Sequence, residues 1–234
     1  MLFLGYDCES TGLNTKEDRI TEIGAVLWDV KNKKPVEIYN CLVKVDKPLT
    51  PQITELTGLT NDILNKHGKA FVDAVKPMFE LATHATHIVA HNGGNFDKPF
   101  LIEECVRNGV TPIDRPWIDS SVDIPYPASI TTRKLVHLAS EHQFLNPFAH
   151  RAVFDVLTML TIISKYDAQE IIRYAESPNI TLRAVVTYDE RTKASSKGYR
   201  WDAERKFWIK TVKSFQLEKE KQESTFEIKE LPNV

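Results

Sequence analysis

Leu2 to Gly12 read LFLGYDCESTG, which places two acids one residue apart directly after an apolar run. In an extended strand, side chains two positions apart share a face and lie about 6.5 Å apart, so Asp7 and Glu9 would face one side and Cys8 the other. Two carboxylates at that separation repel each other by about 2.5 kcal/mol at an effective dielectric constant of 20. A basic side chain, a shared proton or a divalent cation must offset this repulsion.

The composition of the 234-residue chain is that of an ordinary globular protein, with 42% hydrophobic and 26% charged residues. This composition excludes disorder throughout. No apolar stretch approaches the roughly 20 residues that span a bilayer, and the N-terminus does not resemble a secretory signal. Three widely spaced cysteines without a CxxC pair favour reduced, buried thiols. We therefore expect a cytoplasmic protein with no membrane partner.

Charge is distributed unevenly along the chain. The net charge is −5 over residues 1–180, +5 over residues 181–215 and −2 over residues 216–234. A basic segment thus follows an acidic body, which a total of −2 conceals.

Hydrophobic periodicity predicts strands at the start of the chain and then strands that alternate with helices. This order is typical of an α/β fold in which a mixed β-sheet is flanked by helices on both faces. We expect strands over residues 2–9, 20–30, 36–43, 87–90 and 117–119, and helices over residues 61–85, 96–108, 130–142 and 154–174.

The composition changes after Ser177-Pro178-Asn179, so we expect a first domain over residues 1–177. Residues 178–215 would form a small basic aromatic module, rich in strands and with one short helix, and residues 216–234 a charged, frayed tail. Basic residues alternate there with aromatic ones, a mixture suited to phosphate contact and base stacking. The same aromatic residues could instead serve as the core of a small module; they are Tyr199, Trp201, Phe207 and Trp208.

Two further acids occupy settings similar to that of Asp7. Asp97 follows a predicted strand and the segment His91-Asn92-Gly93-Gly94, and Asp155 ends the segment His150-Arg151-Ala152-Val153-Phe154-Asp155. Each acid could simply cap a helix, and a single histidine is more often structural than catalytic. Taken together, four carboxylates could bind two divalent ions, with His150 available as a base near neutral pH.

These segments resemble the motifs of the DEDDh family of ribonuclease-H-like 3′–5′ exonucleases, which includes polymerase proofreading subunits. Residues 7–13 match Asp-x-Glu-(Thr/Ser)-Thr-Gly-Leu, residues 91–97 match the second motif, and residues 150–155 match the third, in which histidine stands five residues before aspartate. Residues 56–60 (LTGLT) are similar to the family's turn between the third strand and the first helix. The resemblance covers residues 1 to about 175.

One departure from the family pattern concerns the second motif. It has one more residue between Asn92 and Asp97 than the proofreading subunits have, and in this length it is similar to mammalian repair exonucleases. This extra residue affects the expected placement of Asn92 but not that of Asp97. Residues 197–208 are similar to a small Arg-Trp-Asp-Ala module found in bacterial and phage nucleic-acid proteins.

The resemblance implies a ribonuclease-H-like domain that removes nucleoside 5′-monophosphates from 3′ ends. Asp7, Glu9 and Asp155 would hold one Mg²⁺ or Mn²⁺ ion, and Asp7 with Asp97, through water, a second; His150 would be the general base. Contacts with the terminal nucleotide are implied for Ser10, Thr11, Leu13 and Asn92.

The expected substrate is single-stranded DNA or a DNA 3′ end. One alternative is an exoribonuclease that trims RNA 3′ ends, since nothing in the sequence reads the sugar 2′-hydroxyl. Another is a nucleic-acid-binding subunit that is non-catalytic or works with a polymerase. Oligomeric state is left open by the sequence.

Overall fold

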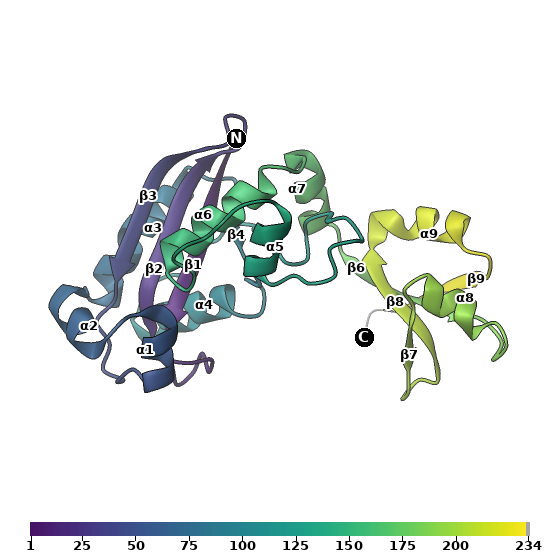
Figure 1. The fold of residues 1–234 in the computed structure, drawn as a ribbon, viewed down its shortest axis with the longest axis horizontal. Coiled ribbons are helices and arrows are strands. Elements are labelled where there is room, and N and C mark those ends of the chain that lie inside the picture. Colours follow the sequence, from purple (N-terminus) through teal and green to yellow (C-terminus); the bar gives the residue numbers. More distant parts are fainter. Residues whose placement is uncertain (233–234) are drawn as a thin grey trace. The chain divides into compact units, whose positions relative to one another are not determined.

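The computed structural model describes residues 1–232, which form two compact units, residues 1–172 and the chain from Arg173 onward (Figure 1). The division falls inside helix α7 (Ala168–Glu176), close to the expected boundary at residue 177. A search of the described residues for a membrane-crossing helix, one both long and apolar enough, finds none.

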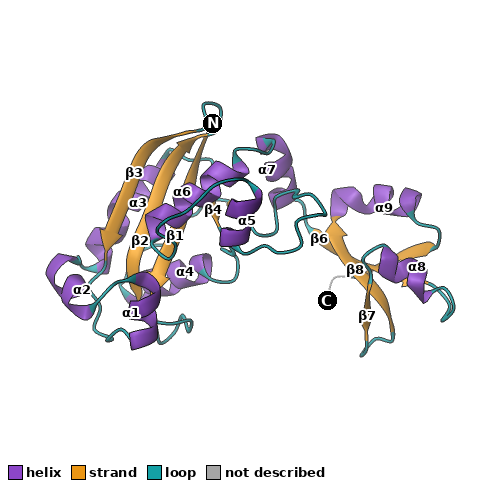
Figure 2. Cartoon of the chain, in the orientation of Figure 1, coloured by secondary structure: helices purple, strands orange, loops and turns teal. Residues whose placement is uncertain are grey.

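The first unit is built on a five-stranded mixed sheet in the order β3-β2-β1-β4-β5 (Figure 2). The first three strands are antiparallel, whereas β4 and β5 join the sheet in parallel. This confirms the predicted α/β fold with a mixed sheet. The strands are β1 (Leu2–Ser10), β2 (Ile20–Asp29), β3 (Lys34–Leu42), β4 (His87–Ala90) and β5 (Trp117–Asp119).

Helices cover both faces of this sheet. Tyr6 and Cys8 of β1 are buried in a core with residues of α3 (Phe71–Thr83) and α4 (Asp97–Arg107). On the other face α6 (Ala152–Ile163) packs against β1 and β2. A Cβ atom on Gly5 would lie 2.6 Å from Cγ1 of Val156, so the absence of a side chain there lets α6 approach the sheet closely.

Several expected helices differ in extent from those observed. The stretch 61–85 forms two helices, α2 (Asn61–His67) and α3, because Gly68 ends the first in an extended conformation and the backbone of Lys69 pairs with that of Val43. The stretch 154–174 is likewise divided into α6 and α7, and α5 (Leu135–Glu141) starts later than expected.

Helix α1 (Pro51–Thr57) was not predicted from the sequence. Proline is well tolerated in the first turn of a helix, where its missing N–H would be unpaired in any case. The Thr50 hydroxyl accepts a hydrogen bond from the Ile53 N–H at the start of α1, and Gly58 ends it in the left-handed conformation (φ 71°).

The second unit holds a four-stranded antiparallel sheet in the order β7-β8-β6-β9. Its core contains Leu182, Ala194 and Tyr199, and its elements lie in the right half of Figure 1. The strands are β6 (Asn179–Val185), β7 (Arg200–Asp202), β8 (Phe207–Lys213) and β9 (Glu227–Leu231), and the helices are α8 (Arg191–Ser196), the 3₁₀ helix η1 (Ser214–Gln216) and α9 (Leu217–Glu223).

The expectation of a frayed tail over residues 216–234 is wrong for residues 217–231. They form α9 and β9, and β9 pairs with β6, which would otherwise be an edge strand. Phe226 and Ile228 pack against the core of this unit. The high charge of the segment conceals this short apolar pattern, and residues 233 and 234 lie outside the described part.

Candidate active site

Three of the predicted carboxylates meet at one end of the first unit. Asp7 and Glu9 lie near the end of β1, and Asp155 lies in the first turn of α6. Each offers an oxygen atom, and these three atoms lie within 4.8 Å of one another. The meeting follows from the packing, since Asp7 pairs across the strands with Gly24, and a Cβ on Gly24 would collide with the backbone of α6 at Ala152 and Val153.

Asp97 lies outside this group of three. It begins α4, is 1% exposed, and its Oδ1 accepts hydrogen bonds from the backbone N (3.2 Å) and Sγ (3.6 Å) of Cys8. Strand β4 pairs with β1 only as far as Gly5. Farther along the same edge of β1, the Asp97 carboxylate and not a strand accepts the hydrogen bond of the Cys8 backbone N. Asp97 thereby joins α4 to the strand that carries Asp7 and Glu9.

Burial and mutual repulsion raise the pKa values of these acids. Burial, and then the charges of Asp97, Glu9 and Asp155, hold the pKa of Asp7 well above its usual range. Burial first, and neighbouring acids second, raise the pKa of Glu9 to about 8, and burial raises the pKa of Asp97 to about 7. A bound divalent cation would favour the ionised forms, and carboxylates are the ligands that hard cations prefer. The donor set therefore fits a hard divalent cation.

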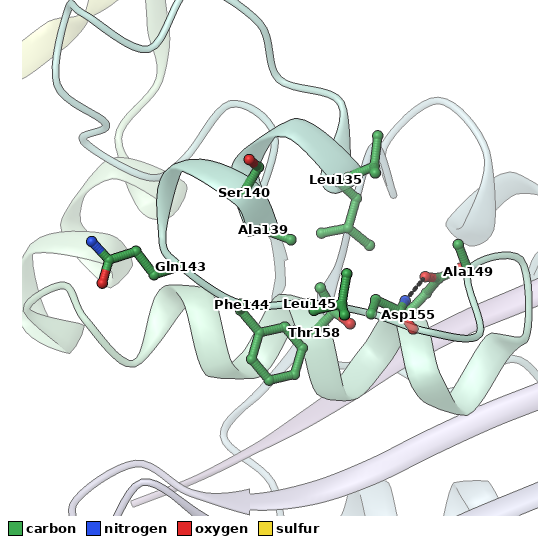
Figure 3. A pocket seen from close by; sticks show the side chains of 11 residues that line it. Leu135, Ala139, Ser140, Gln143, Phe144, Leu145, Ala149, Asp155 and Thr158 are labelled. Atoms are coloured by element: carbon green, nitrogen blue, oxygen red, sulfur yellow. Dashed lines mark hydrogen bonds between the residues drawn. The ribbon is translucent and has the colours of Figure 1, made fainter.

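Asp155 is held by its own neighbours. Its Oδ2 accepts a hydrogen bond from the backbone N of His150 (2.9 Å), and its Oδ1 accepts one from Nδ2 of Asn146 (2.7 Å), drawn as a dashed line in Figure 3. Despite these bonds, burial raises the pKa of Asp155. Both partners come from the segment just before α6, so this loop fixes the carboxylate.

His150 adopts the left-handed backbone conformation (φ 62°), which few residues other than glycine adopt. Its side chain is exposed, and the residue lines a cavity of about 760 Å³ together with Asp7, Asn92 and Asp155. The structure thus brings a histidine and two of the predicted acids to the wall of one cavity, which we call the catalytic cavity.

Two basic residues that we did not predict, Arg133 and Lys134, also line the catalytic cavity. They precede α5, in a stretch that we had expected to be helical. Their only signal in the sequence is a pair of adjacent cations, which is too common to identify a site.

A second, mostly apolar cavity of about 380 Å³ adjoins the first between α5 and α6 (Figure 3). Leu135 and Ala139 of α5 line it, as do Phe144 and Leu145 of the following loop. Asp155 lines both cavities. The carboxylate therefore stands at the boundary between a charged and an apolar space.

Glu22 and Arg151 form a partly buried ion pair that we did not predict. Glu22 is fully buried on β2, and its carboxylate accepts hydrogen bonds from the Arg151 guanidinium, the shortest being Nε to Oε2 at 3.0 Å and Nη2 to Oε1 at 2.8 Å. It also accepts from the backbone N of Ala152 and from Nδ2 of Asn40. This pair ties β2 to the start of α6, beside His150. An acid inside the apolar run 20–30 was the available signal.

The predicted nucleotide contacts behave differently from one another. The Ser10 hydroxyl donates to the carbonyl of Gly12, and the Thr11 hydroxyl donates to Oδ1 of Asp18 (2.9 Å), so both stabilise the loop after β1. Leu13 on the same loop is 83% exposed. An apolar side chain is thus presented to solvent by a loop held through internal hydrogen bonds.

Asn92 is placed by the loop that follows β4. It has a left-handed conformation (φ 60°), its backbone N donates to Oδ1 of Asp119 (2.9 Å), and it lines the catalytic cavity. The extra residue in this loop therefore leaves Asn92 at the cavity wall.

Two family models match the chain. The exonuclease family (RNase_T) matches residues 4–163, which is more than half of the chain, and a domain of unknown function (DUF8626) matches residues 180–231. The second match includes β9 and so agrees with a folded second unit that extends past residue 216.

Among proteins of known function, the chain is similar to bacterial replication proteins. It is 31% identical over 120 residues to a PolC-type DNA polymerase III of Mycoplasma genitalium, a match that covers 50% of this chain and 8% of the polymerase. It is 29% identical over 187 residues to the DNA polymerase III subunit epsilon of Treponema pallidum, covering 76% of this chain and 85% of the subunit. The matches cover between 7% and 12% of the length of such PolC-type polymerases.

Solved structures with the same fold include exonuclease I, with a TM-score of 0.65, 18% identity, and coverage of 78% of this chain and 48% of that one. The nuclease domain of 3′hExo, a DEDDh family member, has a TM-score of 0.59 at 17% identity and covers 70% of this chain and 90% of that one. Since the exonuclease match spans residues 4–163, this chain belongs to the exonuclease family, and its first unit has the ribonuclease-H-like fold of these solved exonucleases.

Proposed function

We propose that this chain is a metal-dependent 3′–5′ exodeoxyribonuclease that releases nucleoside 5′-monophosphates. The observation that carries the proposal is the group formed by Asp7, Glu9 and Asp155, whose oxygen atoms lie within 4.8 Å of one another. Asp7 and Asp155 line the same cavity as His150. A cluster of acids beside a histidine is an arrangement suited to metal-assisted phosphodiester hydrolysis.

In this proposal Asp7, Glu9 and Asp155 hold one Mg²⁺ or Mn²⁺ ion, and Asp7 helps to hold a second. Asp97 takes part through water, in keeping with its hydrogen bonds to Cys8, which leave it less free to bind an ion directly. Two bound divalent ions supply the positive charge that stabilises the attacking and leaving oxygens of an in-line displacement. Asn146 keeps the Asp155 carboxylate in position by donating to its Oδ1.

His150 accepts the proton of the attacking water. Imidazole is the side chain best suited to proton transfer near neutral pH. The hydrogen bond from its backbone N to Asp155 fixes the main chain of His150 relative to that carboxylate, while its exposed side chain remains free to reach into the catalytic cavity.

The substrate in this proposal is single-stranded DNA or a DNA 3′ end. Arg133 and Lys134 place positive charge in the catalytic cavity, where phosphates would bind, and Asn92 and Leu13 are in place to touch the last nucleotide. Structures of the similar Escherichia coli exonuclease I include a complex with single-stranded DNA, which favours this substrate. RNA is the second candidate, because the similar 3′hExo domain was solved with rAMP.

The test is a time course with a 20-nucleotide DNA and the matching RNA, each labelled at either end. We expect 5′-labelled DNA to shorten stepwise, 3′-labelled DNA to release its label at once as a mononucleotide, and EDTA to stop both. His150→Ala should lower the rate at least a hundredfold, whereas His84→Ala, which alters an exposed histidine outside the catalytic cavity, should not. Near-normal turnover by His150→Ala would disprove the assigned base, and faster RNA shortening would identify the chain as an RNA trimmer.

A further inference from the structure

The second unit contains a cavity of its own, with a volume of about 320 Å³. It lies where β6 ends, between the segment that leads into α8 and the hairpin formed by β7 and β8, both visible in Figure 1. We call it the aromatic cavity. Its lining includes four aromatic and three basic residues, Tyr188, Trp201, Phe207, Trp208, Arg183, Arg191 and Lys206.

The aromatic side chains in this cavity are more exposed than the core of the unit requires. Trp201 is 52% exposed and Tyr188 is 78% exposed, although the unit already has a closed core around Leu182 and Tyr199. The Trp201 ring meets the Trp208 ring at a steep angle (64°) with centroids 5.9 Å apart, so Trp208 is not stacked flat on its face. Exposed aromatic faces of this kind are stacking surfaces for nucleobases.

The basic side chains lie close to these rings. The Arg183 guanidinium lies 4.5 Å from the centroid of the Phe207 ring, and that of Arg191 lies 3.9 Å from the centroid of Tyr188. The Nε of Arg183 is buried and meets no hydrogen-bond acceptor among the residues described. A buried donor without an acceptor is costly, and an acceptor on a ligand would relieve that cost.

Three of the basic residues of this unit line the aromatic cavity, although the unit as a whole has only a small net charge. From residue 173 to residue 234 the sequence has thirteen basic and ten acidic residues, a net charge of only +3. The acids of α9 and β9 pair with basic residues of their own surroundings, as in Lys210–Glu220 (2.5 Å) and Lys221–Glu218 (2.9 Å). Within the described chain no carboxylate lines the cavity.

We propose that the aromatic cavity binds single-stranded nucleic acid, with a base stacked on Trp201 or Tyr188 and neighbouring phosphates held by Arg183, Arg191 and Lys206. An apolar ligand would leave the three cations without a partner, and a small anion would leave the aromatic rings uncovered. The choice of nucleic acid as the ligand rests on the proposed function, whereas the aromatic and basic lining of the cavity does not depend on that proposal.

The test measures binding by the full chain carrying Asp7→Asn, in EDTA, so that the oligomer is not hydrolysed. Fluorescence anisotropy of labelled dT20 should show binding weakened by at least fivefold in Trp201→Ala, the lower end of what loss of one stacked base gives. Trp201→Phe should restore most of the affinity and Trp201→Leu should not, because leucine replaces the apolar surface but cannot stack. An abasic oligomer should bind all these variants equally.

The charge contribution is tested separately with Arg191→Ala. It should weaken dT20 binding and lower the slope of log K against log salt by about 0.7, the value for one phosphate contact on a single strand. The matched control is Lys219→Ala on the exposed face of α9, which should change neither quantity. The Arg191→Ala variant also keeps the proposal testable if Trp201→Ala lowers the thermal stability of the second unit.

Equal binding of dT20 by Trp201→Phe, Trp201→Leu and the parent would overturn the proposal, as would equally strong displacement of dT20 by polyglutamate. These outcomes are separate from the fate of the proposed function. A wild-type chain that hydrolyses no oligomer would refute the nuclease and leave the binding result standing, whereas normal hydrolysis with binding independent of Trp201 would refute only the aromatic cavity.

Discussion

Asp7 is central to the proposed metal site of the first unit. It lies in the strand that forms the centre of the sheet, it lines the catalytic cavity, and burial together with three neighbouring acids raises its pKa. The same residue that would hold divalent ions therefore destabilises the metal-free protein. Function and stability are opposed at this position, as they often are at active sites.

Asp7→Asn should abolish hydrolysis and yet stabilise the metal-free protein. The neutral amide removes a ligand charge, and it also removes repulsion against Glu9, Asp97 and Asp155. We expect nuclease activity to fall at least a thousandfold and the melting temperature in EDTA to rise by about 2–4 °C, the change expected for about 1 kcal/mol in a chain of this size. A melting temperature below that of wild type would contradict the electrostatic part of the account.

The raised pKa values also predict how stability depends on pH. Glu9, with a pKa of about 8, and Asp97, with a pKa of about 7, stay protonated in the folded metal-free protein where the unfolded chain has released its protons. The free energy of unfolding should therefore fall as pH rises from about 4.5 to 8. Urea denaturation at several pH values in EDTA would show this fall, and Glu9→Gln should reduce it.

Saturating Mg²⁺ should make the same curve flatter, because metal binding favours the ionised carboxylates and adds stability that grows with metal concentration. A metal-free stability that is constant or rising up to pH 8 would show that these acids are not held in the protonated form.

Helix α6 is the element that assembles the site. It carries Asp155, it lies close to the sheet because Gly5 and Gly24 have no side chains, and its start is tied to β2 by the Glu22–Arg151 pair. His150 immediately precedes Arg151 in the chain. The position of the proposed catalytic residues thus depends on contacts made outside the catalytic cavity.

Arg151→Ala should test this role. It leaves the Glu22 carboxylate buried with fewer partners, and we expect a loss of about 2–3 kcal/mol, somewhat below the 3–5 kcal/mol of a fully buried pair because Arg151 is about one-third exposed. We also expect weaker metal activation, seen as a higher Mg²⁺ concentration at half-maximal rate.

Two further variants identify the cause of the Arg151→Ala effect. Arg151→Lys should rescue it poorly, since an ammonium group cannot reproduce the two parallel hydrogen bonds. Glu22→Gln in the Arg151→Ala background should recover part of the stability, because it removes the unpaired charge. Wild-type stability in Arg151→Ala would contradict the account.

What could be predicted from the sequence depended on whether the signal was local. The segments around Asp7, Asp97 and Asp155 are short continuous runs, so their setting at strand ends and helix starts was readable, and the strands of the first sheet followed from apolar runs. The Glu22–Arg151 pair joins residues 129 positions apart, and no local pattern reveals such a contact. Strand β9 was missed because its stability comes from pairing with β6 and not from its own composition.

The two units differ in charge as well as in fold. The sequence has a net charge of −5 over residues 1–172 and of +3 over residues 173–234. An acidic exonuclease domain attracts divalent cations but repels a polyanionic strand, and basic residues elsewhere in the chain can compensate for this. The acids of residues 216–234 lower the net positive charge of the second unit. The proposed binding of nucleic acid therefore depends on the basic residues that line the aromatic cavity and not on the total charge.

A chain that ends at residue 225 should lose the fold of its second unit. It lacks β9 and Phe226, whose ring packs edge-on against Tyr199 with centroids 5.5 Å apart, and it exposes the edge of β6. Limited proteolysis with mass spectrometry should cut this unit rapidly and leave residues 1–172 intact. A chain that ends at residue 232 serves as the control, and equal resistance of the two truncated chains would show that β9 is dispensable.

The most direct test of the account is anomalous diffraction from crystals of the wild-type protein grown with Mn²⁺ and a nucleoside 5′-monophosphate. We predict a manganese peak within coordination distance of Asp7, Glu9 and Asp155, with the phosphate of the nucleotide against it and His150 facing the phosphate. Manganese bound elsewhere, or a nucleotide bound away from these three carboxylates, would contradict the central claim that they form the catalytic metal site.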